Sequence, residues 1–251
     1  PLANPVFAIL ATFAAYVVTL IMRPFGGAFF GNFGDKHGRK KAMIITIMGF
    51  SIATFATGLL PTWEMAGLMA PVFLILLRFM QGFFAGGEWG SGAVITMETV
   101  PKKHRGLLSG FLQSGFNFGF VIASVVFFGA VSLFPEEQFV EIGWRIMFFT
   151  GIIPGLVALF VRFRMNESQV WLAKQKQKKT EKSPLKKLLS SKDGRKRFIF
   201  SLILMTGLMY AYYTSIGFYP TFLQNYVEIE KTEVSLLMIV ATTTSLFGQI
   251  F

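Results

Sequence analysis

The chain has 251 residues, of which 53% are hydrophobic and only 15% are charged, whereas about 25% of the residues in a soluble domain are charged. This composition excludes a water-soluble domain, which would lack the charges needed to cover its surface, and indicates an integral membrane protein. The absence of cysteine excludes disulfides, thiol catalysis and cysteine-ligated metals, while the net charge of +11 leaves nucleic-acid binding to be judged from where the charges lie.

Seven apolar runs of helix-forming length follow one another along the chain. Most are close to or longer than the roughly 20 residues that a helix needs to cross a hydrocarbon core about 30 Å thick. An open sheet cannot span lipid, and the short alternating segments of a barrel are absent. The predicted fold class is therefore an all-α membrane protein with about seven transmembrane helices. We expect these helices at about 6–33, 41–60, 70–97, 106–133, 144–163, 198–223 and 233–251.

Basic residues are confined to alternate loops. All but four of the 24 Lys and Arg residues lie in three loops, 34–41, 101–105 and 162–197. Because Lys and Arg favour the cytoplasmic side of membrane helices, these loops are predicted to be cytoplasmic in a multi-pass protein of the cell (plasma or inner) membrane. The positive charge is then an orientation signal, and the lipid bilayer rather than nucleic acid is the expected partner.

Charged residues also interrupt the apolar helices, where they are costly and therefore mark candidate functional sites. They are Arg23, Arg78, Glu88 and Glu98. Arg78 and Glu88 lie ten residues, or about 15 Å, apart on one helix. They cannot pair directly, so each needs a partner on another helix, a substrate or water. Arg78 could equally belong to a structural ion pair, and Glu88 could carry a proton or be a silent neutral acid.

Uncharged polar residues recur in the same helices, at Gln81, Gln113, Ser114, Asn117, Tyr210 and Tyr213. Gln113 and Asn117 are four residues apart and should share a helix face. The tyrosines lie midway along the sixth helix, which Gly217 and Pro220 interrupt. A broken helix beside polar residues is typical of a transport site, although an aromatic belt could also explain tyrosines.

Small residues recur at four-residue spacing, which lets helices approach closely in lipid. The stripes are Gly82-Gly86-Gly90, Gly115-Gly119-Ala123, Gly106-Gly110 and Gly27-Gly31. Helix packing explains such stripes better than direct contact with a ligand does.

The first cytoplasmic loop has a distinctive pattern, G-x-x-x-D-K-x-G-R-K-K, over residues 31–41. A basic turn needs Lys and Arg, but not an aspartate flanked by glycines at fixed offsets. The pattern resembles the signature between helices 2 and 3 of the major facilitator superfamily, and Gly31, Asp35, Gly38 and Arg39 fall on it.

Further stretches also match that superfamily. Arg78-Phe-Met-Gln81-Gly82 with the G-G-E-W-G run at 86–90 resembles helix 4 of proton-coupled metabolite symporters. Glu98 and Arg105 resemble the E-x6-R element of sugar porters. Gly143-Trp144-Arg145 and the stretch 165–169 resemble the ends of helix 6, although the latter lacks the prolines and arginine of the usual P-E-S-P-R. Within the superfamily, sialate:proton and metabolite:proton symporters are the most similar.

The resemblance implies a major-facilitator-type helical bundle. Residues 1–163 would form the N-terminal bundle, with family helices 2–6, and residues 164–197 a basic cytoplasmic linker. Residues 198–251 would begin the C-terminal bundle with helices 7 and 8. Helix 1 and helices 9–12 would be missing, so the chain is interpreted as a piece of a longer transporter.

Roles for individual residues also follow from the resemblance. Asp35 and Arg39 would belong to a cytoplasmic gate, in which Glu98 pairs with Arg39 and Arg105 pairs with Glu167. These ion pairs would hold in the outward-open state and break in the inward-open state. Arg78 would lie in the central cavity. The family often sets an acid of helix 1 against it, and without helix 1 the best remaining acidic candidate is Glu88.

The predicted function is secondary active transport of a small solute by proton-coupled alternating access, with a monomeric transport unit and an organic acid as the leading candidate. A sugar or a zwitterion such as a betaine is the alternative. The candidates for contact with solute or proton are Arg23, Arg78, Gln81, Glu88, Gln113, Asn117, Tyr210 and Tyr213. A receptor or scaffold is less favoured, since it has no need of the gate charges. Enzyme activity, metals and cofactors are not expected, because both histidines lie in loops and no nucleophile–base or metal-ligand spacing occurs.

Overall fold

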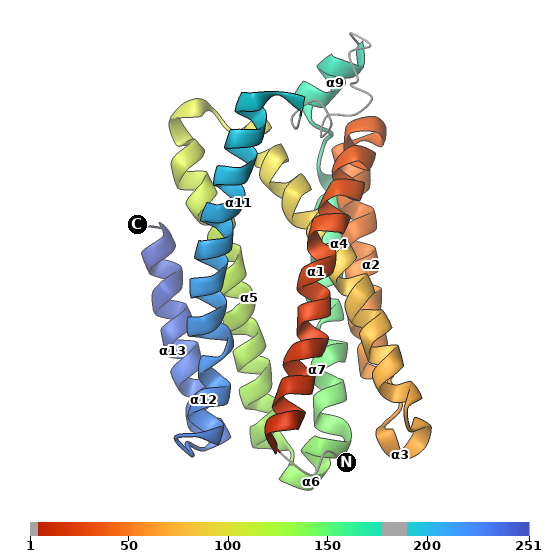
Figure 1. Ribbon diagram of the computed structural model, residues 1–251, viewed down its shortest axis with the longest axis vertical. Coiled ribbons are helices and arrows are strands. Elements are labelled where there is room, and N and C mark those ends of the chain that lie inside the picture. The colour runs from red at the N-terminus through yellow and green to blue at the C-terminus, as the bar shows by residue number, and fades with distance from the viewer. Residues whose placement is uncertain (1–4, 177–189, 251) are drawn as a thin grey trace. The chain divides into compact units, whose positions relative to one another are not determined.

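The computed structural model describes residues 5–176 and 190–250, and within these ranges the chain is almost entirely helical (Figure 1). Its helices are α1 (Pro5–His37), α2 (Arg39–Gly58), α3 (Trp63–Ala66), α4 (Met69–Thr99), α5 (Arg105–Leu133), α6 (Glu136–Gln138), α7 (Trp144–Thr150), α8 (Ile152–Arg164), α9 (Gln169–Lys176), α11 (Lys192–Tyr212), α12 (Tyr219–Asn225) and α13 (Lys231–Ile250). A 3-10 turn covers Lys102–His104, and π-helical segments cover Phe139–Gly143 and Tyr213–Gly217.

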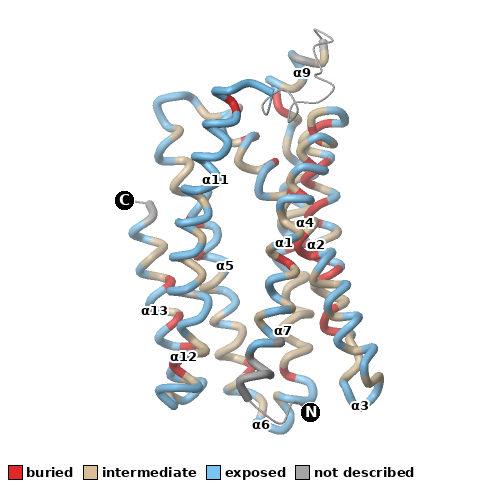
Figure 2. Tube along the Cα trace, viewed as in Figure 1, coloured by how far each residue is buried: buried red, intermediate tan, exposed pale blue. Residues whose placement is uncertain are grey.

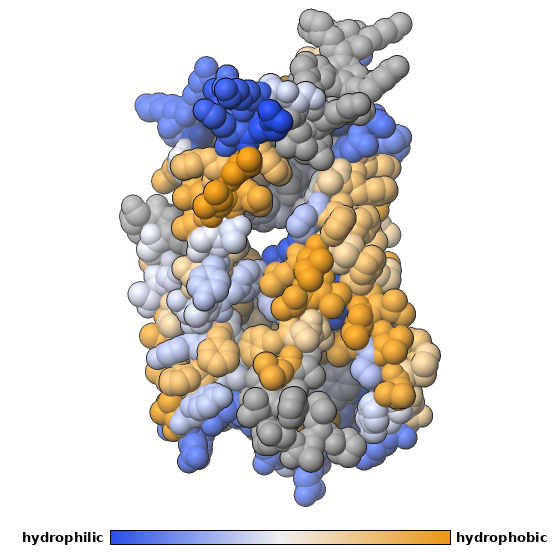
Figure 3. All heavy atoms as spheres, viewed as in Figure 1, coloured by the Kyte–Doolittle hydropathy of each residue, from blue (hydrophilic) through white to orange (hydrophobic). Residues whose placement is uncertain are grey.

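Six helical segments of the described residues are long and apolar enough to cross a membrane, which confirms the predicted fold class. They are Thr12–His37, Arg39–Gly58, Met69–Thr99, Lys102–Leu133, Glu136–Arg164 and Lys192–Asn225. The seventh predicted run is the 20-residue helix α13. Over α1 and α4 the surface is mostly hydrophobic, as lipid contact requires (Figure 3).

One expected element end needs correction, because α11 begins at Lys192 and not near residue 198, whereas α8 ends at Arg164, close to the predicted end at about 163. The basic residues that the sequence assigned to one long loop partly belong to helices, because α8 continues to Arg164 and α11 already begins at Lys192. Ser191 accounts for the early start of α11, since its hydroxyl accepts a hydrogen bond from the Gly194 backbone N–H and caps the first turn. The centre of the predicted linker, residues 177–189, lies outside the described residues.

The chain divides into two compact units, and each is described by itself. Unit 1 comprises residues 1–112 and 136–180, and unit 2 comprises residues 113–135 and 181–251. The division passes through α5, whose first turns belong to unit 1 and whose remainder belongs to unit 2.

Within unit 1, α1 and α4 touch backbone to backbone. A Cβ atom at Gly82 would overlap the carbonyl group of Thr19, and one at Gly86 would overlap that of Arg23. Buried residues gather where α1, α2 and α4 pack together (Figure 2). The packing explanation therefore holds for these two glycines. At Gly90, Gly106, Gly115 and Gly119, no atom of the described residues lies within 4 Å of a Cβ, so no packing partner is seen for these glycines within their units.

This difference predicts opposite effects for two alanine substitutions on α4. At Gly86 the obstacle is a backbone carbonyl that cannot rotate away, and overpacking costs about 1–3 kcal/mol. At Gly90 the space is open, so the helix propensity of alanine should stabilise by up to about 1 kcal/mol. We expect a lower melting temperature for Gly86→Ala than for Gly90→Ala, measured by thermal unfolding in detergent. Equal melting temperatures would contradict the close approach of α1 and α4.

The far end of α2 is held by Arg145 of α7. The guanidinium Nη1 donates to the carbonyl oxygens of Gly58 at 2.8 Å and Leu60 at 2.6 Å, and it stacks over the Trp144 ring at 4.5 Å. Carbonyl groups at a helix C-terminus have no partner within the helix. The structure therefore shows that the G-W-R sequence ties α7 to the end of α2.

Unit 2 contains the interruption that the sequence predicted in its sixth helix. The π-helical segment Tyr213–Gly217 ends α11, and α12 then begins with Pro220 in its first turn. A proline is tolerated in a first turn because its missing N–H would have no partner there. Leu223 of α12 packs against Val234 and Met238 of α13 in a small buried core.

Candidate functional site

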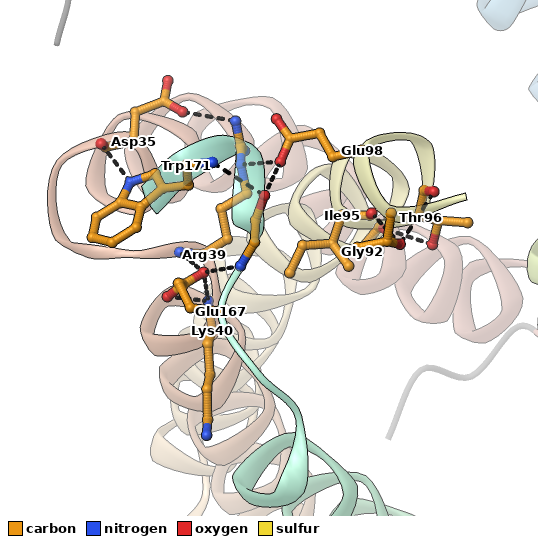
Figure 4. A network of polar contacts seen from close by, with 11 residues as sticks. Asp35, Arg39, Lys40, Gly92, Ile95, Thr96, Glu98, Glu167 and Trp171 are labelled. Atoms are coloured by element: carbon orange, nitrogen blue, oxygen red, sulfur yellow. Dashed lines mark hydrogen bonds and ion pairs between the residues drawn. The ribbon is translucent and has the colours of Figure 1, made fainter. Parts of the chain in front are cut away.

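The end of α1, the start of α2 and the end of α4 meet at Arg39 in unit 1 (Figure 4). The Arg39 Nη2 atom donates to Asp35 Oδ1 at 2.9 Å, and its Nε atom lies 3.5 Å from Glu98 Oε2. The second contact is an ion pair that lacks hydrogen-bond geometry. Only 12% of the Arg39 side chain is exposed, so this cation is held between two carboxylates from two other helices.

The segment after α8 adds Ser168 and Trp171 to this cluster. The Ser168 hydroxyl donates to Glu98 Oε2 at 2.6 Å and accepts from the backbone N–H of Trp171 at 3.3 Å. The indole Nε1 of Trp171 donates to the carbonyl oxygen of Asp35 at 2.9 Å. Ser168 thereby caps α9 while it contacts α4, and Trp171 fastens α9 to the end of α1. Neither residue was among the predicted site residues.

Glu167 binds the N-terminus of α2. Its carboxylate accepts from the backbone N–H of Arg39 at 3.0 Å and of Lys40 at 3.2 Å, where the helix dipole favours a negative charge. Gly38 makes room for it: its φ is 108°, and a Cβ there would lie 2.5 Å from a Glu167 carboxylate oxygen. The glycine of the motif is therefore required both by its backbone conformation and by the space it leaves.

The expected ion pair between Arg105 and Glu167 is not formed, which corrects that prediction. Arg105 Nε instead donates to the carbonyl oxygen of Val100 at 3.3 Å and closes the turn before its own helix. The physical reason is that Gly38 has no side chain to cap α2, so Glu167 satisfies these N–H groups and is no longer available to Arg105.

Glu88 lies deeper in unit 1, between three helices. Its Oε1 atom is 2.8 Å from Arg162 Nη2 of α8, and its Oε2 atom accepts from the hydroxyl of Thr46 of α2 at 2.8 Å. From the sequence, Arg162 is placed in the basic loop 162–197, and its pairing with Glu88 is not predicted. The available signal was that Arg162 falls inside the last apolar run of the first bundle, 144–163.

Arg78 forms a different arrangement on α4. Its Nη1 atom donates to Gln81 Oε1 at 2.9 Å, and Gln81 in turn donates to the hydroxyls of Thr54 and Thr57 on α2. The guanidinium also lies 5.8 Å from the centre of the Phe148 ring. None of the ion pairs among the described residues includes Arg78, so no carboxylate offsets its half-buried charge. Arg23 is half-buried on α1, with its backbone carbonyl against Gly86.

The remaining candidates belong to unit 2 and are only partly brought together. Asn117 is fully buried and donates to the Ser245 hydroxyl of α13 at 2.9 Å. The neighbouring Phe116 ring packs edge-on against Tyr212 at 5.2 Å, and Tyr213 packs against Tyr212 at 5.7 Å. Gln113, in contrast, is exposed although it lies one turn from Asn117, and Tyr210 is 74% exposed. The sequence pattern did not predict Ser245 as the partner of Asn117.

Comparison with known proteins places this arrangement in a family. The model of the Major Facilitator Superfamily matches residues 3–251. The inner membrane metabolite transport protein YhjE of Escherichia coli is 36% identical over 214 residues, which are 85% of this chain and 47% of that protein. The proline/betaine transporter of Salmonella typhimurium is 33% identical over 99% of this chain and 51% of its own length. The shikimate transporter of Escherichia coli is 40% identical over 67% of this chain and 38% of its own length.

Solved structures agree with the fold. The proton:xylose symporter XylE bound to 6-bromo-6-deoxy-D-glucose has a TM-score of 0.71 at 19% identity, covering 93% of this chain and 57% of that one. The chain spans about half the length of the curated relatives it matches. Its relatives are membrane transporters and not enzymes, and it is a multi-pass protein of the cell membrane. This chain belongs to the major facilitator superfamily.

Proposed function

We propose that the full-length protein is a secondary transporter that moves a small carboxylate-bearing solute by proton-coupled alternating access, with an organic acid as the first candidate. The observation that carries this proposal is the half-buried charge of Arg78, which no carboxylate of the described residues offsets. A cation inside a membrane helix is costly unless it meets an anion. A solute carboxylate would supply that anion.

The neighbours of Arg78 support a binding role. Gln81 holds one nitrogen of the guanidinium, and Thr54 and Thr57 hold Gln81 in turn. A guanidinium has five N–H donors in a planar fork that matches the geometry of a carboxylate. Because Nη1 alone is engaged by a hydrogen bond in the described structure, further donors remain for a ligand, and the orientation of the fork is set in advance.

A zwitterion such as a betaine is the second candidate. It also carries a carboxylate, and relatives named as proline/betaine transporters match 99% of this chain. A neutral sugar has no carboxylate and would leave the charge of Arg78 without a counterion, so we place it third.

The cluster of Asp35, Arg39 and Glu98 is proposed as the cytoplasmic gate. It ties together the ends of α1, α2 and α4, and Ser168 extends it to α9. Ion pairs at helix ends can be exchanged for water when helices separate, which suits a contact that must open and close.

Uptake by proteoliposomes tests the proposed function directly. Vesicles holding the full-length protein should accumulate a solute from a panel of shikimate, other organic acids, proline and betaine when the interior is alkaline. A protonophore should abolish the accumulation, and protein-free vesicles serve as the control. Uptake of xylose alone, or no difference from empty vesicles for any solute, would contradict the proposal.

A further inference from the structure

We propose that Glu88 carries the coupled proton, and that this proton competes with Arg162 for the Glu88 carboxylate. The inference rests on the proposed function, since it assigns a residue to the proton of that transport cycle. It begins from position. Among the described residues, the other carboxylates lie at helix ends or in connecting segments, whereas Glu88 lies in the interior of α4, about 15 Å from Glu98 along the axis.

Glu88 pairs with a cation that another helix carries. Its described contacts are Arg162 of α8 at 2.8 Å and Thr46 of α2 at 2.8 Å. Arg39, the cation of the gate cluster, pairs with Asp35 and Glu98 instead. If Arg162 leaves the pair, the Glu88 carboxylate loses this cation, and a carboxylate without a counter-charge inside a membrane helix is costly unless it binds a proton.

Thr46 can serve both states of Glu88. Its buried hydroxyl oxygen lies 2.8 Å from Glu88 Oε2 and 3.0 Å from the carbonyl oxygen of Met43. When Glu88 is ionised, the Thr46 hydroxyl donates its hydrogen to Glu88 Oε2. When Glu88 is protonated, the hydroxyl can donate to Met43 and accept from the Glu88 O–H. Because the Thr46 hydroxyl can donate to either Glu88 or Met43, Glu88 has a hydrogen bond in both its ionised and its protonated state.

Arg162 is placed where it can leave the pair. It lies in the last turn of α8, with 21% of its side chain exposed, so a rotation of its long side chain would carry the charge toward water. A separate helix carries it, because α8 is divided from α7 at Gly151. Glu167 lies three residues beyond the end of α8 and binds the N-terminus of α2, and the next residue, Ser168, contacts Glu98 of the gate cluster.

In the proposed exchange, a proton replaces Arg162 as the partner of the Glu88 carboxylate. In one state the Glu88 carboxylate is paired with Arg162 and carries no proton. In the other, a proton from water binds a Glu88 oxygen, the ion pair breaks, and Arg162 turns to solvent. The end of α8 that moves with Arg162 leads directly into the segment that holds the gate cluster.

Three variants in proteoliposomes test this assignment. Glu88→Gln keeps the hydrogen bond to Thr46 but cannot carry a proton. It should lose accumulation driven by a pH gradient, so that internal solute only reaches the external concentration, while exchange of labelled for unlabelled solute continues. The exposed carboxylate Glu64 of α3 provides the matched control, and Glu64→Gln should accumulate solute as the wild type does. Glu88→Asp keeps a titratable group and should retain accumulation in part.

The double variant Glu88→Gln, Arg162→Gln tests whether Glu88 carries a proton or only forms a structural ion pair with Arg162. In the single variant Glu88→Gln, Arg162 loses its partner, which could unfold the protein. The double variant removes this unpaired charge. If Glu88 carries the proton, the double variant exchanges solute but does not accumulate it. Accumulation by the double variant, or by Glu88→Gln, would overturn the assignment while leaving the proposed function in place. A wild type without any response to the pH gradient would instead overturn both.

Discussion

Replacement of Arg78 by alanine is expected to abolish the rise in melting temperature that a bound carboxylate solute produces in the wild-type protein. Truncating one partner of a buried charge pair costs about 2–5 kcal/mol, and about 1.4 kcal/mol corresponds to a tenfold change in affinity. Binding should therefore weaken by roughly 30-fold or more. The measurement is thermal unfolding with and without solute, followed by direct binding.

The variant should remain folded without solute, because the described interactions of Arg78 are with neutral groups: Gln81, the Phe148 ring and, electrostatically, Tyr16. Arg164, at the exposed end of α8, offers a matched control. Arg164→Ala removes the same charge and should keep the solute-dependent shift. A normal shift in Arg78→Ala would reduce Arg78 to a structural residue and leave the proposed carboxylate without its binding partner.

Replacement of Arg39 by glutamine is expected to lower the initial rate of uptake by about tenfold or more, which corresponds to about 1.4 kcal/mol. The variant leaves Asp35 and Glu98 facing each other without the cation between them. A buried charged group that loses its partner costs about 1–3 kcal/mol, although Asp35 recovers part of this from water and Glu98 keeps its hydrogen bond from Ser168. The states in which the gate cluster is formed would then be depopulated. Proteoliposome uptake, normalised to the amount of inserted protein, measures the effect.

Two further variants sharpen the test of the gate. Arg39→Lys keeps the charge but cannot reach both carboxylates with a planar fork, so an intermediate rate is expected. Lys41→Gln removes an exposed charge two residues away and should transport at the wild-type rate. Wild-type uptake by Arg39→Gln at normal insertion would remove Arg39 from the gate.

Much of the gate cluster could be predicted because its residues are close in sequence or belong to one motif. Asp35 and Arg39 are four residues apart, and the ion pair of Arg39 with Glu98 was expected from the resemblance and is present. The choice of Glu167 between Arg105 and the α2 N-terminus was predicted wrongly. That choice depends on which helix end lies nearest, and on the space left by Gly38, neither of which a sequence pattern contains.

The glycine stripes show the same limit. All had the same four-residue spacing, yet among the stripe glycines whose surroundings are described, only Gly82 and Gly86 would place a Cβ within 3 Å of a neighbouring backbone. Spacing places residues on one helix face, but the rotation of the helix decides whether that face meets a partner or open space. The ion pair between Glu88 and Arg162 was missed for a related reason, since 74 residues separate the two along the chain.

The sequence by itself determined that the protein is helical and membrane-spanning, and its alternating basic loops predicted which helix ends face the cytoplasm. Both properties follow from local composition, because lipid excludes unpaired backbone groups and the membrane sorts positive charge. Only the tertiary structure decided that Arg162 meets Glu88 and that Glu167 binds the start of α2. Such contacts depend on the rotation and neighbours of each helix, which packing of the whole unit sets.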